Sequence, residues 1–171
     1  MNKTEDIRES DVFFIFTLML SGYVKIPVEV RKIEEDGFHL TVSARINGKP
    51  VHLLIDTGAS RTVFDKQRSL RFVSENSHEP NDKLSTGLGT STMQTHLVRL
   101  NKIKLGDLVI EDFEAVLLDL EHVNNSYEKL GLLPIDGVLG SDLLVKYSAV
   151  IHYGKKELKL FAKASKNHRV K

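Results

Sequence analysis

Leu-Leu-Ile-Asp-Thr-Gly-Ala-Ser, residues 53–60, combines a short apolar run with an Asp-Thr-Gly tripeptide. Its leading apolar residues predict a buried strand, and the Asp-Thr-Gly that follows predicts a tight turn at the end of that strand. A buried and unpaired carboxylate costs several kcal/mol, so Asp56 is expected to be hydrogen-bonded, paired or protonated. The hydroxyls of Thr57 and Ser60 can donate to it, and Gly58 lets backbone N–H groups approach it closely.

An Asp-x-Gly sequence at a strand end is often only a turn, because Asp bonds its own backbone and Gly accepts a positive φ. A second stretch, residues 135–144, gives the first one more weight. It contains an apolar-apolar-Gly segment at Val138, Leu139 and Gly140. Together the two stretches resemble the signature of the pepsin and retropepsin aspartic proteases. In that family the Asp-Thr-Gly turn carries the catalytic aspartate, and the apolar-apolar-Gly segment, followed by a short helix, packs beside it.

The resemblance implies an all-β fold, a retropepsin-like acid protease barrel with one or two short helices. Many short strands at near-regular spacing independently favour a barrel or sandwich over a parallel sheet. We expect an N-terminal extension over residues 1–24, a protease domain over 25–162 and a basic tail over 163–171.

Aspartic protease catalysis uses two carboxylates that share one proton. The sequence has a single Asp-Thr-Gly, and the Asp136-Gly137 pair has no Thr or Ser between its two residues, so Asp136 is interpreted as a structural turn residue. The second catalytic carboxylate is therefore expected to be Asp56 of another subunit. This predicts a homodimeric endopeptidase that cleaves polypeptides at a site on its two-fold axis.

The remaining site residues follow from the resemblance. Thr57 would bond across the dimer, Gly58 would let the two backbones meet, and Ser60 could bond the outer carboxylate oxygen. A flap over an extended peptide would be formed by the glycine-rich segment 84–93, whose tip is Gly87, Leu88 and Gly89. Site support would come from Val138, Leu139 and Gly140.

Local patterns predict the elements around these motifs. Residues 26–33 suit an edge strand because they contain Pro27, and residues 38–46 alternate into a hairpin turn at Asn47-Gly48. Asp65 is expected to cap a short helix that runs to Leu70. Ser141 is expected to cap a second short helix over residues 141–147. Residues 119–131 read as a polar connection with a helical turn near their end.

Composition excludes several other classes of protein. A net charge of +1 gives no reason to expect a nucleic-acid partner, and the absence of cysteine excludes disulfides and thiol chemistry. The seven histidines show no metal-binding spacing, and Gly87-Leu88-Gly89 lacks the Gly-Lys-Ser/Thr of a phosphate loop. Neither a metal nor a cofactor is expected.

The N-terminal apolar run, residues 12–20, is too short to span a membrane, which takes about 20 residues. Acidic residues outnumber basic ones before it, which disfavours a secretory signal. We expect a cytoplasmic protein without stable membrane insertion, rather than one secreted or membrane-associated through residues 12–20.

Two alternatives to an active protease remain open at this point. One is a retropepsin-like binding or dimerisation module with little or no turnover, because a motif is not an activity. The other is an unrelated β domain in which Asp56 is only a turn residue.

Overall fold

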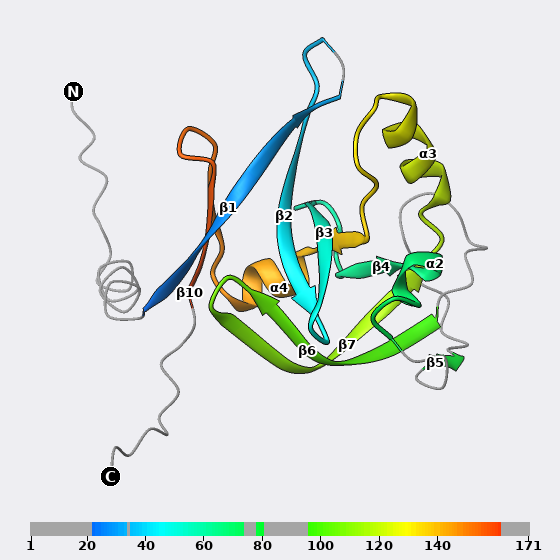
Figure 1. Cartoon of the computed structure of the whole chain (residues 1–171). Helices are drawn as coiled ribbons and strands as arrows, with labels where there is room; N and C mark the ends of the chain where they lie inside the picture. Colours follow the sequence, from blue (N-terminus) through cyan, green and yellow to red (C-terminus); the bar gives the residue numbers. More distant parts are fainter. Residues whose placement is uncertain (1–21, 34, 74–77, 81–95, 162–171) are drawn as a thin grey trace, which may run out of the picture.

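The computed structural model describes residues 22–33, 35–73, 78–80 and 96–161 (Figure 1). The strands of this part are β1 (Tyr23–Lys32), β2 (Phe38–Ile46), β3 (Lys49–Ile55), β4 (Val63–Asp65), β5 (His78–Pro80), β6 (His96–Leu105), β7 (Leu108–Leu118), β8 (Gly137–Leu139), β9 (Val150–His152) and β10 (Glu157–Phe161). Its helices are α2 (Lys66–Ser69), α3 (Glu121–Lys129) and α4 (Ser141–Lys146).

The strands form one sheet that closes on itself. Neighbours run in the order β5-β6-β7-β4-β8-β3-β2-β1-β10-β9, and a further pairing joins β6 to β2. That pairing closes β6, β7, β4, β8, β3 and β2 into a barrel, with β1, β10 and β9 continuing beyond it (Figure 1). The predicted all-β, retropepsin-like barrel is therefore confirmed.

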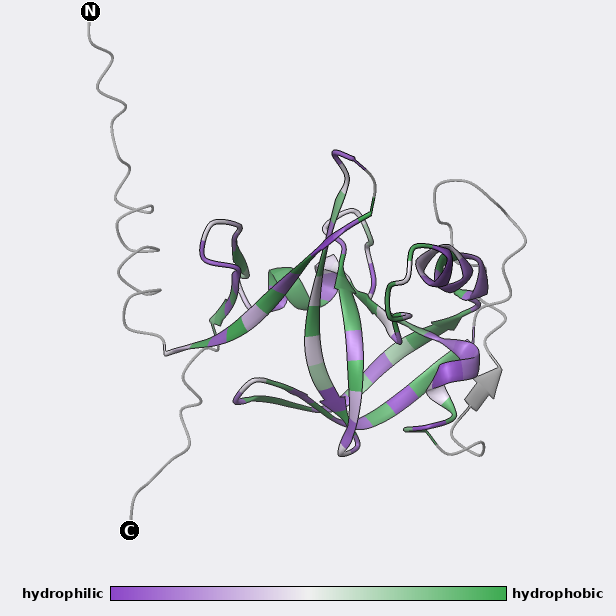
Figure 2. Ribbon diagram, turned by 45° about the horizontal axis from the view of Figure 1, so that its top comes forward, coloured by the Kyte–Doolittle hydropathy of each residue, from purple (hydrophilic) through white to green (hydrophobic). Residues whose placement is uncertain are grey.

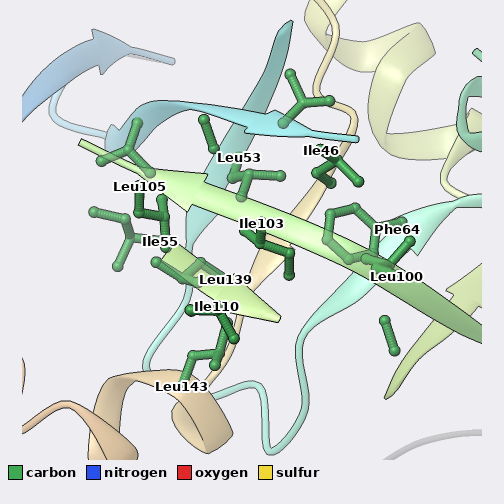
Figure 3. Close-up of a cluster of buried hydrophobic side chains, with 14 of the residues drawn as sticks. Ile46, Leu53, Ile55, Phe64, Leu100, Ile103, Leu105, Ile110, Leu139 and Leu143 are labelled. Atoms are coloured by element: carbon green, nitrogen blue, oxygen red, sulfur yellow. The ribbon is translucent and has the colours of Figure 1, made fainter. Parts of the chain in front are cut away.

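Alternating side chains fill the barrel. Along β2 and β10 nearly every second residue is buried, which appears as alternating apolar and polar bands on the strands in Figure 2. The buried side chains come from strands far apart in the sequence (Figure 3). Among them, Leu53 and Ile55 of β3 and Leu139 of β8 hold the two motif strands against this core.

β1 is not the simple edge strand that the sequence predicts. Residues 23–27 pair with β10 and residues 28–32 pair with β2, so the strand bridges two neighbours. Pro27 lies where the pairing changes. Proline has no N–H to donate to a neighbouring strand, so β1 accommodates Pro27 at the point where its pairing passes from β10 to β2.

The hairpin turn between β2 and β3 and helix α2 match the sequence predictions. Asn47 and Gly48 both have positive φ, at 48° and 83°, as the predicted hairpin turn between β2 and β3 requires. The Asp65 carboxylate accepts a hydrogen bond from the Arg68 N–H and caps α2. The Ser141 prediction is wrong: the N-cap of α4 is Gly140, and Ser141 is the first helical residue.

Helix α3 replaces the connection expected over residues 119–131. Its N-cap residue is Leu120, whose apolar side chain cannot cap the helix, so the residue type that usually marks a helix start is missing from that position. The Asp119 carboxylate, one residue earlier, accepts a 2.9 Å hydrogen bond from the Glu121 N–H. Tertiary packing of Tyr127, which is buried, and of Asn124 holds the helix. The Asn124 side chain bonds both the N–H and the carbonyl of Ile135 and so anchors the chain that leads to β8.

Several predictions lie outside the described residues. They are the flap at 84–93, the N-terminal apolar run at 12–20 and the tail at 163–171. The domain boundaries at residues 24 and 162 also stay predictions. No helix in the described part of the chain is long and apolar enough to cross a membrane.

Tyr127 is expected to make the free energy of unfolding fall as the pH rises through the alkaline range. Burial raises the pKa of its hydroxyl, and the charge of Arg31 opposes that shift. The folded state therefore favours the neutral phenol, whose contribution is complete below the unfolded pKa of about 10 and is lost as pH rises through the higher folded value. In urea unfolding from about pH 9 to 11.5, we expect the wild type to lose more free energy of unfolding than Tyr127→Phe. Parallel curves for the two proteins would contradict this.

Candidate active site

Two parallel strands bring the two sequence motifs together. β3 pairs with β8 in parallel register, with Ile55 opposite Leu139. Parallel neighbours end at the same edge of a sheet, so the Asp56 turn and Gly140 lie side by side although they are 84 residues apart in the chain. The Asp56 N–H donates to the Leu139 carbonyl oxygen, with an N–O distance of 3.2 Å.

The Asp56 carboxylate is exposed at this edge in the single chain. Its Oδ1 accepts a hydrogen bond of 2.8 Å from the Gly58 N–H, and the Ala59 N–H bonds the Asp56 carbonyl at 3.3 Å. A Cβ on Gly58 would lie 3.2 Å from Asp56 Oδ1, which is a tight contact. Glycine at this position therefore lets the backbone amide and the carboxylate approach each other.

The start of α4 fixes the turn from the other side. The Ser141 N–H donates to the Ala59 carbonyl at 2.8 Å, and the Ser141 hydroxyl donates to the Thr57 carbonyl at 2.9 Å. The side chains of Thr57 and Ser60 are exposed, which leaves their hydroxyls accessible to a second chain or to a substrate. Their predicted roles stay predictions.

Thr62 and Asp142 join the two motifs, and sequence reasoning missed this pair. Asp142 Oδ1 accepts hydrogen bonds from the Thr62 N–H at 2.9 Å, the Thr62 hydroxyl at 2.7 Å and the Leu143 N–H at 2.8 Å. The Thr62 hydroxyl in turn accepts from the Gly140 N–H at 3.1 Å. The signal available in the sequence was only a Thr after the first motif and an Asp after the second.

We expect Thr62→Val to destabilise the protein by about 2 to 4 kcal/mol, because the Gly140 N–H and the Asp142 carboxylate both lose a buried partner. Thr41→Val is the matched control, since Thr41 is as deeply buried and its hydroxyl makes only a 3.4 Å bond to Glu29. Chemical unfolding measures both variants. Equal losses in the two would show that the Thr62 bonds do not hold the site together.

Val138 and Leu139, which are predicted to support the site, pack into two different apolar clusters. Leu139 faces the main core, whereas Val138 belongs to a second apolar cluster with Leu120, Tyr127 and Ile135. Residues that are only partly buried border this second cluster, and they include Leu54, Ala59 and Val63 from the strands and turn around Asp56. Apolar surface therefore adjoins the exposed carboxylate.

Gly140 allows the two motifs to touch. A Cβ there would lie 2.8 Å from the Thr62 nitrogen and closer still to the carbonyl group of Arg61. The segment after the Asp56 turn thus packs directly on the backbone of Gly140.

Asp136 is a buried carboxylate at the far end of the same strand pair. It lies at a bend directly before β8, and its side chain contacts His52 of β3 together with Arg68 and Arg71. This supports its interpretation as structural rather than as a second catalytic aspartate. In the described part of the chain, no three His, Asp or Glu side chains gather closely enough to hold a metal ion.

Comparisons with known proteins agree with this geometry. A family model described as aspartyl protease matches residues 42–143, which include both motifs. Comparison with curated proteins gives no significant match.

Two solved structures share the fold, each with a TM-score of 0.50. One is the retroviral protease-like domain of Ddi1 from Leishmania major, at 17% identity over 71% of this chain and 87% of that chain. The other is a retropepsin-like aspartic protease from Rickettsia conorii, at 19% identity over 81% of this chain and 89% of that chain. The shared fold and the family match together rule out the alternative of an unrelated β domain. The extent of the family match, together with the closed barrel and the paired motifs, shows that the chain belongs to the aspartyl protease family.

Proposed function

We propose that the protein is a homodimeric aspartic endopeptidase in which the Asp56 carboxylates of two subunits form one catalytic site. The observation that carries this proposal is the exposed Asp56 carboxylate on a turn held by β8 and α4. A single Asp-Thr-Gly per chain supplies one such carboxylate, whereas the reaction needs two. A two-fold axis beside Asp56 supplies the second.

The chemistry follows from holding two carboxylates close together. Like charges about 3 Å apart do not both ionise, so the pair keeps one proton over a wide pH range. The ionised carboxylate takes a proton from a water molecule, which attacks the peptide carbonyl carbon. The protonated carboxyl donates to the carbonyl oxygen as the tetrahedral intermediate forms.

The neighbouring residues would position the pair and the substrate. The exposed Thr57 side chain is available for a bond to the partner subunit, and Gly58 leaves room for the two turns to approach. Ser60 would bond the outer carboxylate oxygen, and the flap at Gly87, Leu88 and Gly89 would cover a peptide bound in extended form.

An extended polypeptide fits the surroundings of the turn. Main-chain hydrogen bonds would give most of its affinity, and pockets for alternate side chains would give selectivity. The partly buried Leu54, Ala59 and Val63 border the second apolar cluster, so pockets formed there would accept apolar side chains.

Hydrolysis of an unfolded protein substrate, measured from acidic to neutral pH at several enzyme concentrations, tests the proposal. We expect the rate to rise faster than linearly with enzyme below the dimer dissociation constant and linearly above it. Sedimentation velocity at the same concentrations gives the fraction of dimer. A dimer that cleaves nothing would instead identify a dimerisation module that has kept the fold without turnover.

A further inference from the structure

Asp136 makes more contacts than a turn residue needs. Its side chain is 1% exposed, and Oδ2 accepts a 2.9 Å hydrogen bond from the His52 N–H. Oδ1 accepts from Arg68 Nε at 2.6 Å and from Arg71 Nη2. Its own N–H donates to the His52 carbonyl at 2.8 Å, and its carbonyl accepts from the Asp65 N–H at 2.9 Å.

These contacts join the elements that meet at the candidate site. His52 lies in β3, four residues before Asp56, and Asp136 lies four residues before Gly140. Four residues of strand span about 13 Å, so the carboxylate ties β3 to the start of β8 at a distance from the reacting atoms. The two arginines bring α2 and the turn after it into the same cluster.

The charges explain why a carboxylate is used here. One buried anion faces two guanidinium groups whose side chains are 31% and 49% exposed, so both cations keep part of their hydration. A buried carboxylate is costly unless it is paired and hydrogen-bonded, and here both of its oxygens are bound. A neutral side chain would satisfy the His52 N–H but would not attract α2.

We propose that Asp136, with Arg68 and Arg71, is a positioning residue that sets the alignment of β3 and β8 and thereby the placement of Asp56. The inference rests on the proposed function. Asp136 does not touch substrate, because its side chain is buried and remote from the turn. Its loss should therefore lower kcat and leave KM nearly unchanged. Misplacement of a catalytic group by a distant mutation costs up to about 100-fold in rate.

Asp136→Asn tests this inference, with Asp65→Asn as the matched control. The asparagine keeps an acceptor for the His52 N–H and loses the attraction to the arginines. Asp65 is also buried, at 2% exposure, and its carboxylate binds the N–H groups of Arg68 and Leu120, not β3 or β8. Both variants remove one buried negative charge beside α2.

We expect Asp136→Asn to lower kcat by about 10- to 100-fold with KM changed less than about threefold. Asp65→Asn should keep kcat within about threefold of the wild type after correction for the unfolded fraction measured in urea. Hydrogen exchange of the Asp56 amide, which bonds Leu139, should quicken in Asp136→Asn only. Equal effects of the two variants on kcat and exchange would overturn the positioning role.

The exchange measurement separates this inference from the proposed function. If the wild type hydrolyses no peptide, the proposed function fails, while faster exchange at Asp56 in Asp136→Asn alone still supports the positioning role. If Asp136→Asn does not fold, Arg71→Ala takes its place, because Arg71 is half-exposed and Arg68 keeps the carboxylate paired. Unchanged kcat and Asp56 exchange in Arg71→Ala would then overturn it.

Discussion

Asp56→Asn is expected to abolish peptide hydrolysis and to leave the fold intact. Asparagine neither takes a proton from water nor supplies one to the carbonyl oxygen, so a dimer of the variant lacks both catalytic groups. The loss should be on the order of 10⁴-fold or more, down to background. The asparagine oxygen can still accept the Gly58 N–H, and the position is exposed, so the free energy of unfolding should change by less than about 1 kcal/mol.

Asp107→Asn is the control for this variant. Asp107 is also exposed, lies in the turn between β6 and β7, and carries the same charge. Initial rates on an unfolded protein substrate, together with urea unfolding curves, measure both variants. If Asp56→Asn hydrolysed the substrate as fast as Asp107→Asn, Asp56 would have no catalytic role.

Gly140→Ala is expected to have the largest effect on stability. The new Cβ would lie 2.8 Å from the Thr62 nitrogen and closer to the carbonyl group of Arg61, and backbone atoms cannot yield as a flexible side chain can. Relief of the overlap requires β8 to move away from the segment after the Asp56 turn. The bonds of Gly140 and Asp142 to Thr62 would break with it. We expect a loss of roughly 3 kcal/mol or more, with loss of activity.

Gly154→Ala separates this packing effect from the general effect of replacing glycine. Its nearest contact would be His152 Cε1 at 3.5 Å, which is an ordinary distance. Its φ does not lie in the left-handed region, so the variant should match the wild type within about 1 kcal/mol. Thermal and urea unfolding measure the free energy of unfolding of both variants. A Gly140→Ala protein as stable as Gly154→Ala would contradict the close packing of the two motifs.

The parts of the fold that depend on neighbouring residues could be predicted from the sequence. The Asn47-Gly48 turn needs positive φ at two successive residues, and the Asp65 cap bonds the N–H three residues ahead. Such interactions lie within one turn of chain, so composition and spacing reveal them. The family signature placed Asp56 beside Gly140, which the parallel pairing of β3 and β8 confirms.

Interactions between distant segments could not be predicted in the same way. Thr62 and Asp142 are 80 residues apart, and Arg68 and Asp136 are 68 residues apart. Each of these residues, taken alone, looks like an ordinary surface or turn residue. Helix α3 is missing from the sequence prediction for a related reason: its N-cap position holds the apolar Leu120, and buried contacts of Tyr127 and Asn124 stabilise the helix.

These distant contacts explain how a short exposed turn can be held in one conformation. Asp56 sits at an exposed edge, where backbone is usually mobile. Here β8, α4 and the Thr62–Asp142 pair fix the residues on either side of it. A rigid turn is what two subunits need if they are to bring like charges together reproducibly.

Subunit mixing tests the shared site most directly. A fixed amount of wild type is incubated with increasing Asp56→Asn protein at concentrations where sedimentation shows only dimers, and hydrolysis is then measured. With free exchange of subunits, activity should fall to about half at equal amounts and to about a tenth at a tenfold excess, because mixed dimers hold only one carboxylate. Activity that stays constant through the whole titration would show that each chain acts alone, and would contradict a site built from two copies of Asp56.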